Sequence, residues 1–92
     1  MKDLADIRKE IDRLDDRISR LFAERMELSL EAAKYKEANN LPILDTSREL
    51  GILARVTENL DEGMAVYVKA LFTAMFEASR SYQSRFWSRG EK

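Results

Sequence analysis

The feature that most constrains this chain is a long apolar stripe that starts at Leu4 and continues to Tyr35. Its members alternate at spacings of three and four residues, a heptad-like pattern typical of an α-helix with one apolar face. Neither glycine nor proline interrupts the pattern before Asn39-Asn40-Leu41-Pro42, where turn-forming residues and a proline predict its end. The sequence therefore predicts a first helix over about residues 4–38. The stripe consists of Leu4, Ile7, Ile11, Leu14, Ile18, Leu21, Arg25, Leu28, Ala32 and Tyr35.

The predicted first helix is too long for a compact monomer of 92 residues. About 35 residues at 1.5 Å each span roughly 50 Å, whereas a globule of this chain length has a diameter of only about 30 Å. The helix must therefore extend beyond the body of the chain with its stripe exposed, and a second copy is the simplest partner for that stripe. We expect an intertwined homodimer. A parallel coiled coil would cover the same stripe, but it leaves the second half of the chain without a role.

A second, shorter helix is predicted over about residues 46–60. Asp45-Thr46-Ser47 supplies its start, and Thr46-x-x-Glu49 fits a capping box, in which a hydroxyl and a carboxylate satisfy the first backbone N–H groups. The apolar face of this helix consists of Leu50, Leu53, Val56 and Leu60.

A third helix is predicted over about residues 64–86, after a break at Asn59-Leu60-Asp61-Glu62-Gly63. Residues 88–92 form a short polar tail. The expected fold is all-α and one domain over residues 1–92, with one very long and two shorter helices in an intertwined homodimeric bundle. Two neighbouring stripes line the third helix, one of Leu71, Met75, Ala78 and Tyr82 and the other of Phe72, Phe76, Ser79, Gln83 and Phe86.

Composition excludes several classes of function. The chain has 16 basic and 17 acidic residues and a net charge of −1, so it lacks the positive charge that nucleic acid or an anionic membrane requires. No apolar run approaches the roughly 20 residues of a membrane span, and the charged start, Met1 to Asp6, has no signal-peptide core. The absence of cysteine is typical of a reducing compartment. We expect a cytoplasmic protein with neither nucleic acid nor a membrane as a partner.

The chain also contains no histidine. Together with the absence of cysteine, this removes the usual general base, the thiolate nucleophile and most transition-metal ligands. No cluster of carboxylates demands magnesium. Catalysis by this chain is therefore expected to need neither a metal nor a cofactor, and to work by positioning and electrostatics.

Polar side chains occupy positions where the helical pattern calls for apolar ones. Arg25 lies in the first stripe, where a guanidinium loses hydration and needs an anion. Lys36 follows on nearly the same face, about 16 Å further along the axis. Ser79 and Gln83 interrupt the phenylalanine stripe of the third helix. Structural roles stay open: an ion pair of Arg25 with a carboxylate of the third helix, a solvated Lys36, and interhelical hydrogen bonds for the serine and the glutamine.

Two charged residues at the start of the second helix complete this set. Arg48 lies in the first turn, where the helix dipole favours acidic residues. If it has no role in a site, it is an ordinary exposed charge. If Glu49 has no role in a site, its structural role is the capping box of the second helix. Taken together, the set describes a cavity lined by three cations, a neutral amide, a hydroxyl and one carboxylate, which suits a small dianion that carries a hydroxyl group.

These residues stand in motifs by which the sequence resembles the all-helical chorismate mutases, including those fused at the N-terminus of prephenate dehydratases. The resemblance runs from Leu4 to about Gln83, and it depends on the order and spacing of all the motifs together. The motifs are Ile7-Arg8-Lys9-Glu10-Ile11-Asp12, Ala23-Glu24-Arg25-Met26-Glu27-Leu28, Lys34-Tyr35-Lys36, Pro42-Ile43-Leu44-Asp45-x-x-Arg48-Glu49 and Glu77-x-Ser79-Arg80-Ser81-Tyr82-Gln83.

The resemblance implies that chorismate is the substrate and that two chains share each site. Arg25 and, from the partner chain, Arg8 would bind the substrate carboxylates. Arg48 would help to position the carboxylate end of the substrate, and Ser79 would contact the ring carboxylate.

The resemblance also implies a mechanism without proton abstraction or a covalent intermediate, the pericyclic rearrangement of chorismate to prephenate on the route to phenylalanine and tyrosine. Lys36 and Gln83 would donate hydrogen bonds to the ether oxygen, whose bond to the ring breaks and whose negative charge grows in the transition state. Glu49 would accept from the ring hydroxyl, assisted by the backbone at Asp45.

Two rival functions are compatible with the same helical pattern. An isochorismate pyruvate lyase shares the fold and a similar set of cations, but the carboxylate of Glu49 suits the hydroxyl of chorismate better. A non-catalytic helical dimerisation or regulatory module would need no Arg25 or Lys36 on an inward face.

Overall fold

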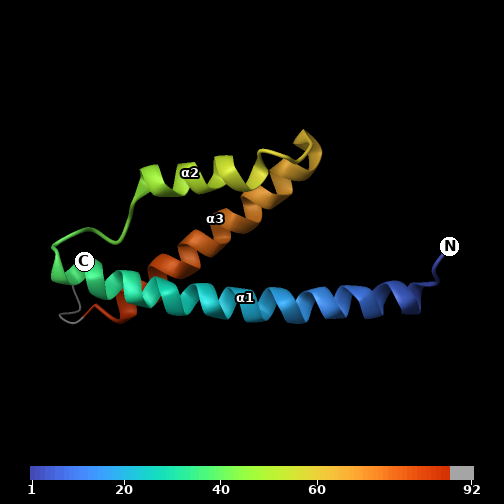
Figure 1. Ribbon diagram of the computed structural model, residues 1–92, viewed down its shortest axis with the longest axis horizontal. Coiled ribbons are helices and arrows are strands. Elements are labelled where there is room, and N and C mark those ends of the chain that lie inside the picture. The colour runs from blue at the N-terminus through green and yellow to red at the C-terminus, as the bar shows by residue number, and fades with distance from the viewer. Residues whose placement is uncertain (88–92) are drawn as a thin grey trace.

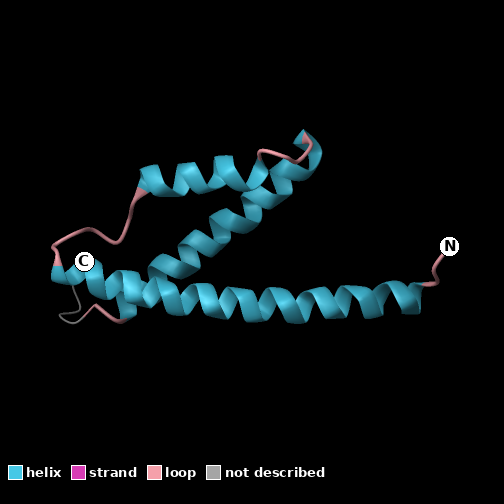
Figure 2. Cartoon of the chain, in the orientation of Figure 1, coloured by secondary structure: helices cyan, strands magenta, loops and turns pink. Residues whose placement is uncertain are grey.

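The computed structural model describes residues 1–87 and contains three helices, α1 (Leu4–Ala38), α2 (Thr46–Thr57) and α3 (Glu62–Arg85). The predicted all-α class, with a first helix of 35 residues, is confirmed, and Figure 2 shows only helices and loops over the described part of the chain. The polar tail predicted for residues 88–92 lies outside the described residues. None of the described helices is both long enough and apolar enough to cross a membrane.

The first helix ends where its sequence predicts. Asn40 has a φ of 56°, the left-handed conformation that asparagine tolerates better than most residues. This turn lets Leu41 N donate to Lys36 O at 2.8 Å and Asn40 N donate to Glu37 O at 3.4 Å, the two hydrogen bonds of a Schellman motif. The motif satisfies the last carbonyl groups of α1 and turns the chain back toward the body of the protein.

The capping box predicted for α2 is wrong. Asp45 is the N-cap, and its carboxylate accepts from Arg48 N at 3.0 Å. Because Asp45 and not Thr46 is the N-cap, Thr46 lies inside the first turn and Glu49 N donates to Asp45 O. The carboxylate of Glu49 has no capping role and forms an ion pair with Arg80 instead. The N-cap Asp45 therefore takes the place of Thr46 in the predicted capping box, and Arg80 takes the place of the backbone N–H as the partner of Glu49.

The boundaries of α2 and α3 also differ from the predicted ones. Helix α2 ends at Thr57, whose hydroxyl donates to Leu53 O at 2.7 Å, and a turn with a bond from Leu60 N to Thr57 O follows. Asp61 caps α3 by accepting from Met64 N at 2.8 Å, so α3 begins at Glu62. The third helix thus takes up residues that the sequence pattern assigned to the break, because an acidic N-cap is a stronger start signal than a nearby glycine is a stop.

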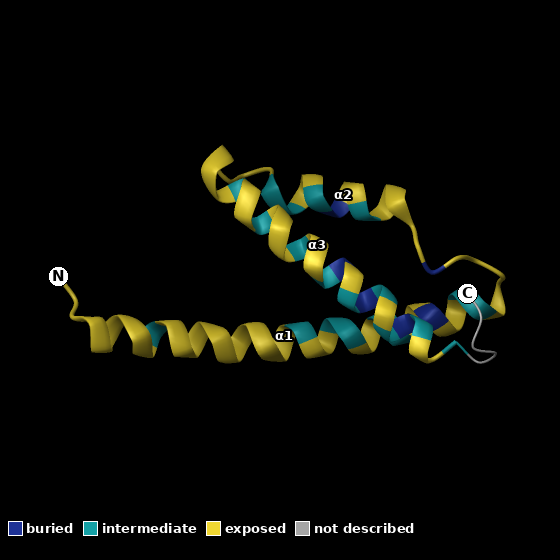
Figure 3. Cartoon of the chain, turned by 180° about the vertical axis from the view of Figure 1, so that it is seen from behind, coloured by how far each residue is buried: buried dark blue, intermediate teal, exposed yellow. Residues whose placement is uncertain are grey.

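Helix α3 joins the other two helices, packing against α1 at one end and against α2 at the other, while α1 and α2 make no helix–helix packing of their own (Figure 1). The result is an elongated chain with extents of 55 × 26 × 14 Å. Within residues 1–87, buried residues lie in the C-terminal halves of α1 and α3, in α2 and in the loop that precedes α2 (Figure 3). They are Ala33, Ile43, Ile52, Phe76, Ser79 and Gln83.

The N-terminal half of α1 lies outside this body, as the length argument predicts. Of residues 1–21, all except Glu10 are exposed (Figure 3). The large apolar side chains of the stripe there are between 39% and 59% exposed, from Ile7 to Leu21. The single chain leaves this stripe uncovered, and the homodimer inferred from it stays a prediction.

Candidate active site

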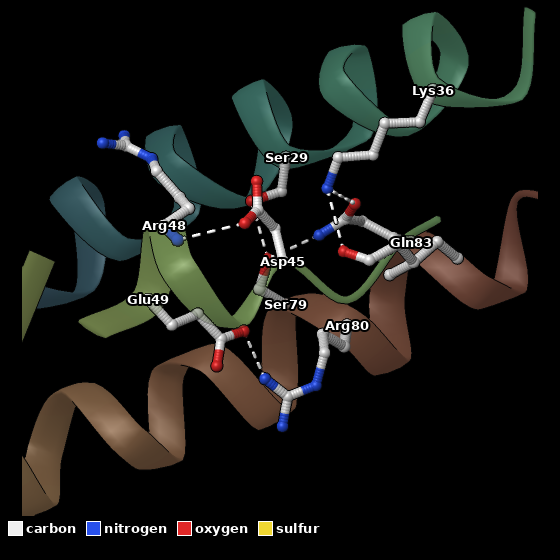
Figure 4. Close-up of polar contacts among 9 residues, drawn as sticks. Ser29, Lys36, Asp45, Arg48, Glu49, Ser79, Arg80 and Gln83 are labelled. Atoms are coloured by element: carbon white, nitrogen blue, oxygen red, sulfur yellow. Dashed lines mark hydrogen bonds and ion pairs between the residues drawn. The ribbon is translucent and has the colours of Figure 1, made fainter. Parts of the chain in front are cut away.

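A cavity of about 290 Å³ lies between the C-terminal half of α1, the start of α2 and the C-terminal half of α3. Its wall combines apolar side chains, among them Leu28, Ile52 and Phe76, with a concentration of charged and polar groups. Figure 4 shows the polar side chains of α1, α2 and α3 converging on this region. A cavity of this size accommodates a small organic molecule.

Every site residue predicted from the sequence lines this cavity, with one exception. Arg8 is exposed on the free half of α1, 17 positions before Arg25 and thus about 25 Å away along the helix axis. The sequence assigned Arg8 to the site of a partner chain, and its placement in one chain leaves that assignment untested. The predicted residues brought together in the cavity wall are Arg25, Lys36, Asp45, Arg48, Glu49, Ser79 and Gln83.

A continuous row of hydrogen bonds crosses the cavity from α1 to α3 and back (Figure 4). Lys36 Nζ donates to Ile43 O at 2.9 Å and to Gln83 Oε1 at 3.4 Å. Gln83 Nε2 donates to Ser79 Oγ at 3.0 Å, and Ser79 Oγ donates to Ser29 Oγ at 2.9 Å. The interhelical hydrogen bonds that the sequence left open for the serine and the glutamine are therefore present.

These hydrogen bonds determine which N–H protons of Lys36 and Gln83 stay available for a ligand. The amide oxygen of Gln83 faces the ammonium group of Lys36, so its NH₂ group points along the row toward Ser79. An ammonium group has three protons and a primary amide has two. One proton of Lys36 and one of Gln83 therefore lack a partner among residues 1–87, and both side chains are part-buried or buried. The two donors are pre-oriented in a partly dehydrated cavity.

Arg25 is half-buried and lies over the ring of Phe76, with its guanidinium carbon 5.8 Å from the ring centroid. Within residues 1–87 it forms no ion pair, so the structural ion pair with a carboxylate of the third helix is not observed. A cation stacked on an aromatic face is held in place while its N–H groups stay available. Arg25 thus presents an unneutralised guanidinium to the cavity.

The start of α2 supplies the remaining charges. Asp45 uses its carboxylate as the helix cap, and Arg48 lines the cavity although it is exposed to solvent. Glu49 is half-buried and pairs with Arg80 of α3. The cavity wall therefore holds more cationic than anionic side chains, Arg25, Lys36, Arg48 and Arg80 against Asp45 and Glu49.

Sequence reasoning missed two polar residues of the wall, Ser29 and Arg80. A signal existed for Ser29, because it lies four positions after Arg25 and seven before Lys36, which places all three on one face of α1. No comparable signal distinguished Arg80 from Arg85 further along α3. The packing of α2 on α3 selects Arg80 as the partner of Glu49.

Comparison with known proteins identifies the family of the chain. Residues 7–84 match the family described as "Chorismate mutase type II". The chain is 33% identical over 88 residues to a chorismate mutase of Methanocaldococcus jannaschii, an alignment that covers 90% of this chain and 86% of the relative. No solved structure matches the chain significantly.

Two further relatives are much longer proteins. The chain is 35% identical over 78 residues to the bifunctional chorismate mutase/prephenate dehydratase of Escherichia coli, over 79% of this chain and 19% of that protein. It is 41% identical over 56 residues to the bifunctional enzyme of Aquifex aeolicus, over 61% of this chain and 16% of that protein. The chain thus spans less than a quarter of the length of these bifunctional relatives. It belongs to the type II chorismate mutases, the isomerases that convert chorismate to prephenate.

Proposed function

We propose that the cavity between α1, α2 and α3 performs the conversion of chorismate to prephenate by fixing the shape of the substrate and stabilising charge on its ether oxygen. The proposal depends on the adjacent N–H donors of Lys36 and Gln83. Each has one proton without an acceptor among residues 1–87, and both lie in a cavity wall with more cations than anions. A pericyclic rearrangement transfers no proton to the enzyme. Its catalyst needs orientation and electrostatic complementarity, and both match the contents of this cavity.

Lys36 and Gln83 are the groups that act on the reacting atoms. As the bond between the ether oxygen and the ring stretches, negative charge grows on that oxygen. The spare ammonium proton of Lys36 and the spare amide proton of Gln83 then donate to it. Because the row from Ile43 to Ser29 already holds both groups, little reorganisation is needed at the moment of reaction.

The cations hold the two carboxylates of the substrate. Arg25, which stacks on Phe76 and has no carboxylate partner among the described residues, binds one of them, and Arg48 helps to position the same end. Ser79, which is buried in the cavity wall, contacts the ring carboxylate. Its hydroxyl proton then turns from Ser29 to the carboxylate, and Ser29 donates to Ser79 Oγ in return. Guanidinium groups suit this role because they bind a carboxylate through two parallel hydrogen bonds.

Glu49 accepts a hydrogen bond from the ring hydroxyl, with the backbone at Asp45 beside it. An ionised carboxylate only accepts hydrogen bonds, so Glu49 binds a hydroxyl group of the substrate and would repel a carboxylate of the substrate in the same position. This feature favours chorismate over isomers that carry the hydroxyl elsewhere on the ring.

We further propose that the functional unit is a homodimer in which each site receives Arg8 from the partner chain. The exposed stripe on the free half of α1 supports the pairing. An antiparallel arrangement of two such helices brings Arg8 of one chain near Arg25 and Lys36 of the other. The second chain thereby covers apolar surface and adds a cation to the site.

The test is direct. Purified protein is added to chorismate, the loss of chorismate absorbance is followed, and the product is identified as prephenate. Isochorismate is assayed in parallel with release of pyruvate as the readout. Turnover of chorismate without prephenate, or a preference for isochorismate, would contradict the proposal.

A further inference from the structure

Arg80 has no role in the mechanism above, yet it lines the cavity. Arg80 Nη1 donates to Glu49 Oε2, and this ion pair joins α3 to α2 between residues 31 positions apart. The side chains are 31% exposed for Arg80 and 24% exposed for Glu49. Figure 4 shows the two side chains extending toward one another from facing helices. The pair is therefore a partly dehydrated contact at the cavity and not a solvated surface pair.

The contact leaves Glu49 able to bind a ligand. Arg80 occupies Oε2, and among residues 1–87 no group donates to Oε1. A carboxylate has about four acceptor sites on its two oxygens, so one bond from a guanidinium fixes the group without saturating it. Glu49 keeps an acceptor for a hydroxyl group in the cavity.

A glutamate in this position needs such a partner for two reasons. Its side chain turns about several bonds, and an unpaired carboxylate would sample many directions. It would also face a substrate that carries two carboxylates of the same sign, and like charges in a partly dehydrated cavity repel strongly. A cation paired with Glu49 removes both difficulties.

We infer that Arg80 is a positioning residue of this reaction: it holds the Glu49 carboxylate in the direction and charge balance in which that carboxylate accepts from the ring hydroxyl of chorismate. Arg80 acts on the hydroxyl only through Glu49, so its role depends on the function proposed above for that carboxylate. The pair thereby makes the site selective for a substrate with a hydroxyl at this position.

The experiment compares four variants of the protein: Arg80→Met, Arg80→Lys, Glu49→Ala and the double variant Arg80→Met/Glu49→Ala. Arg85→Met is the matched control, because Arg85 is an exposed arginine of the same helix outside the cavity wall. Each protein is assayed for kcat and KM with chorismate and with an analogue that lacks the ring hydroxyl. Circular dichroism and thermal unfolding report on the fold.

With chorismate, we expect Arg80→Met to lower kcat/KM about tenfold, Arg80→Lys to stay within about threefold of the parent, and Arg85→Met within about twofold. With the analogue, Arg80→Met and the parent should agree within about twofold, because no hydroxyl is left for Glu49 to bind. In the Glu49→Ala background, the further change Arg80→Met should also alter kcat/KM by less than about twofold.

Two results would overturn the inference while leaving the proposed function intact. One is an equal loss for Arg80→Met on both substrates, which would mean that Arg80 binds a substrate carboxylate itself or supports the fold. The other is full activity of Arg80→Met on chorismate while Glu49→Ala is impaired. If Glu49→Ala instead lost nothing on chorismate, or lost equally on both substrates, the hydroxyl role of Glu49 would fail, and the role of Arg80 with it.

Discussion

Lys36 and Gln83 are 47 positions apart in the sequence, yet the ammonium group of Lys36 lies 3.4 Å from the amide oxygen of Gln83. The contact joins the last turn of α1 to the last turns of α3, and it aligns the two donors on which the proposed mechanism depends. The row of hydrogen bonds that continues through Ser79 to Ser29 holds the glutamine amide in one orientation.

Lys36→Met should lower kcat for chorismate by about 10² to 10³, the usual cost of losing one pre-oriented donor to a developing oxyanion. The side chain keeps its apolar stem and loses only the ammonium group. Lys34→Met is the control, because Lys34 is exposed on the same helix and does not line the cavity. Steady-state kinetics measure both variants. Equal kcat values for Lys36→Met and the parent would remove Lys36 from the reacting centre.

Gln83→Glu should convert a flat pH profile into one that falls as the pH rises. The parent has no histidine or cysteine, the side chains that ordinarily titrate between about pH 6 and 9, so its activity should change little across neutral pH. A glutamic acid, with an ordinary pKa of about 4.3, donates a hydrogen bond only below its pKa. Above it, the group is a carboxylate that repels the growing charge on the ether oxygen, and the optimum moves toward acid.

The measurement is kcat/KM from about pH 4.5 to 8.5 for the parent and Gln83→Glu, with Gln83→Leu as a non-titrating variant. Gln83→Leu should be slow at every pH. A Gln83→Glu protein as active as the parent at pH 8 would mean that Gln83 does not donate to the ether oxygen.

The stability of the protein should depend on its concentration, because the stripe on the free half of α1 has no cover within one chain. For a dimer that unfolds to two separate chains, each tenfold rise in concentration adds about 1.4 kcal/mol to the free energy of unfolding per dimer. Thermal or urea unfolding across a hundredfold concentration range, together with sedimentation, measures the effect.

Leu14→Gln and Arg13→Gln provide the matched comparison for this prediction. Both place a residue of good helix propensity in the same turn of α1, but only Leu14 belongs to the apolar stripe. Leu14→Gln should weaken the dimer and Arg13→Gln should not. A folded monomer at micromolar concentration in the parent would contradict the dimer.

Two inactive variants should restore activity to one another when their chains are mixed. Arg8 and Lys36 are 28 positions apart on one straight helix, about 42 Å along its axis, so no substrate can touch both in a single chain. Homodimers of Arg8→Ala and of Lys36→Ala should each be nearly inactive. A mixed dimer has one intact site, and its other site carries both defects.

Random exchange makes about half of the dimers mixed, so about a quarter of the parental activity should return. Exchange is promoted by dilution or mild denaturant and confirmed by native mass spectrometry. Mixed dimers that form and show no recovered activity would place Arg8 within its own chain or outside the site.

The sequence by itself determined the long first helix, its end and the family. Helical periodicity and turn chemistry are local, because backbone hydrogen bonds join residues four positions apart and a Schellman turn needs only Asn40 and its neighbours. The stripe from Leu4 to Tyr35 therefore predicted a helix of the length that is observed. The ordered motifs contain seven polar residues that the fold brings together in the cavity wall, while Arg8 lies apart from them and Ser29 and Arg80 were not predicted.

Only the tertiary structure decided which side chains meet in the cavity. The partner of Glu49 is Arg80 and not the N-terminus of its own helix. Arg25 lies over the ring of Phe76 and forms no ion pair with a carboxylate of residues 1–87. These choices depend on where α3 crosses α1 and α2, and that crossing is set by the packing of residues dozens of positions apart. A charged side chain accepts whichever counter-charge packing brings within reach, so its partner is not encoded in the local pattern of its own helix.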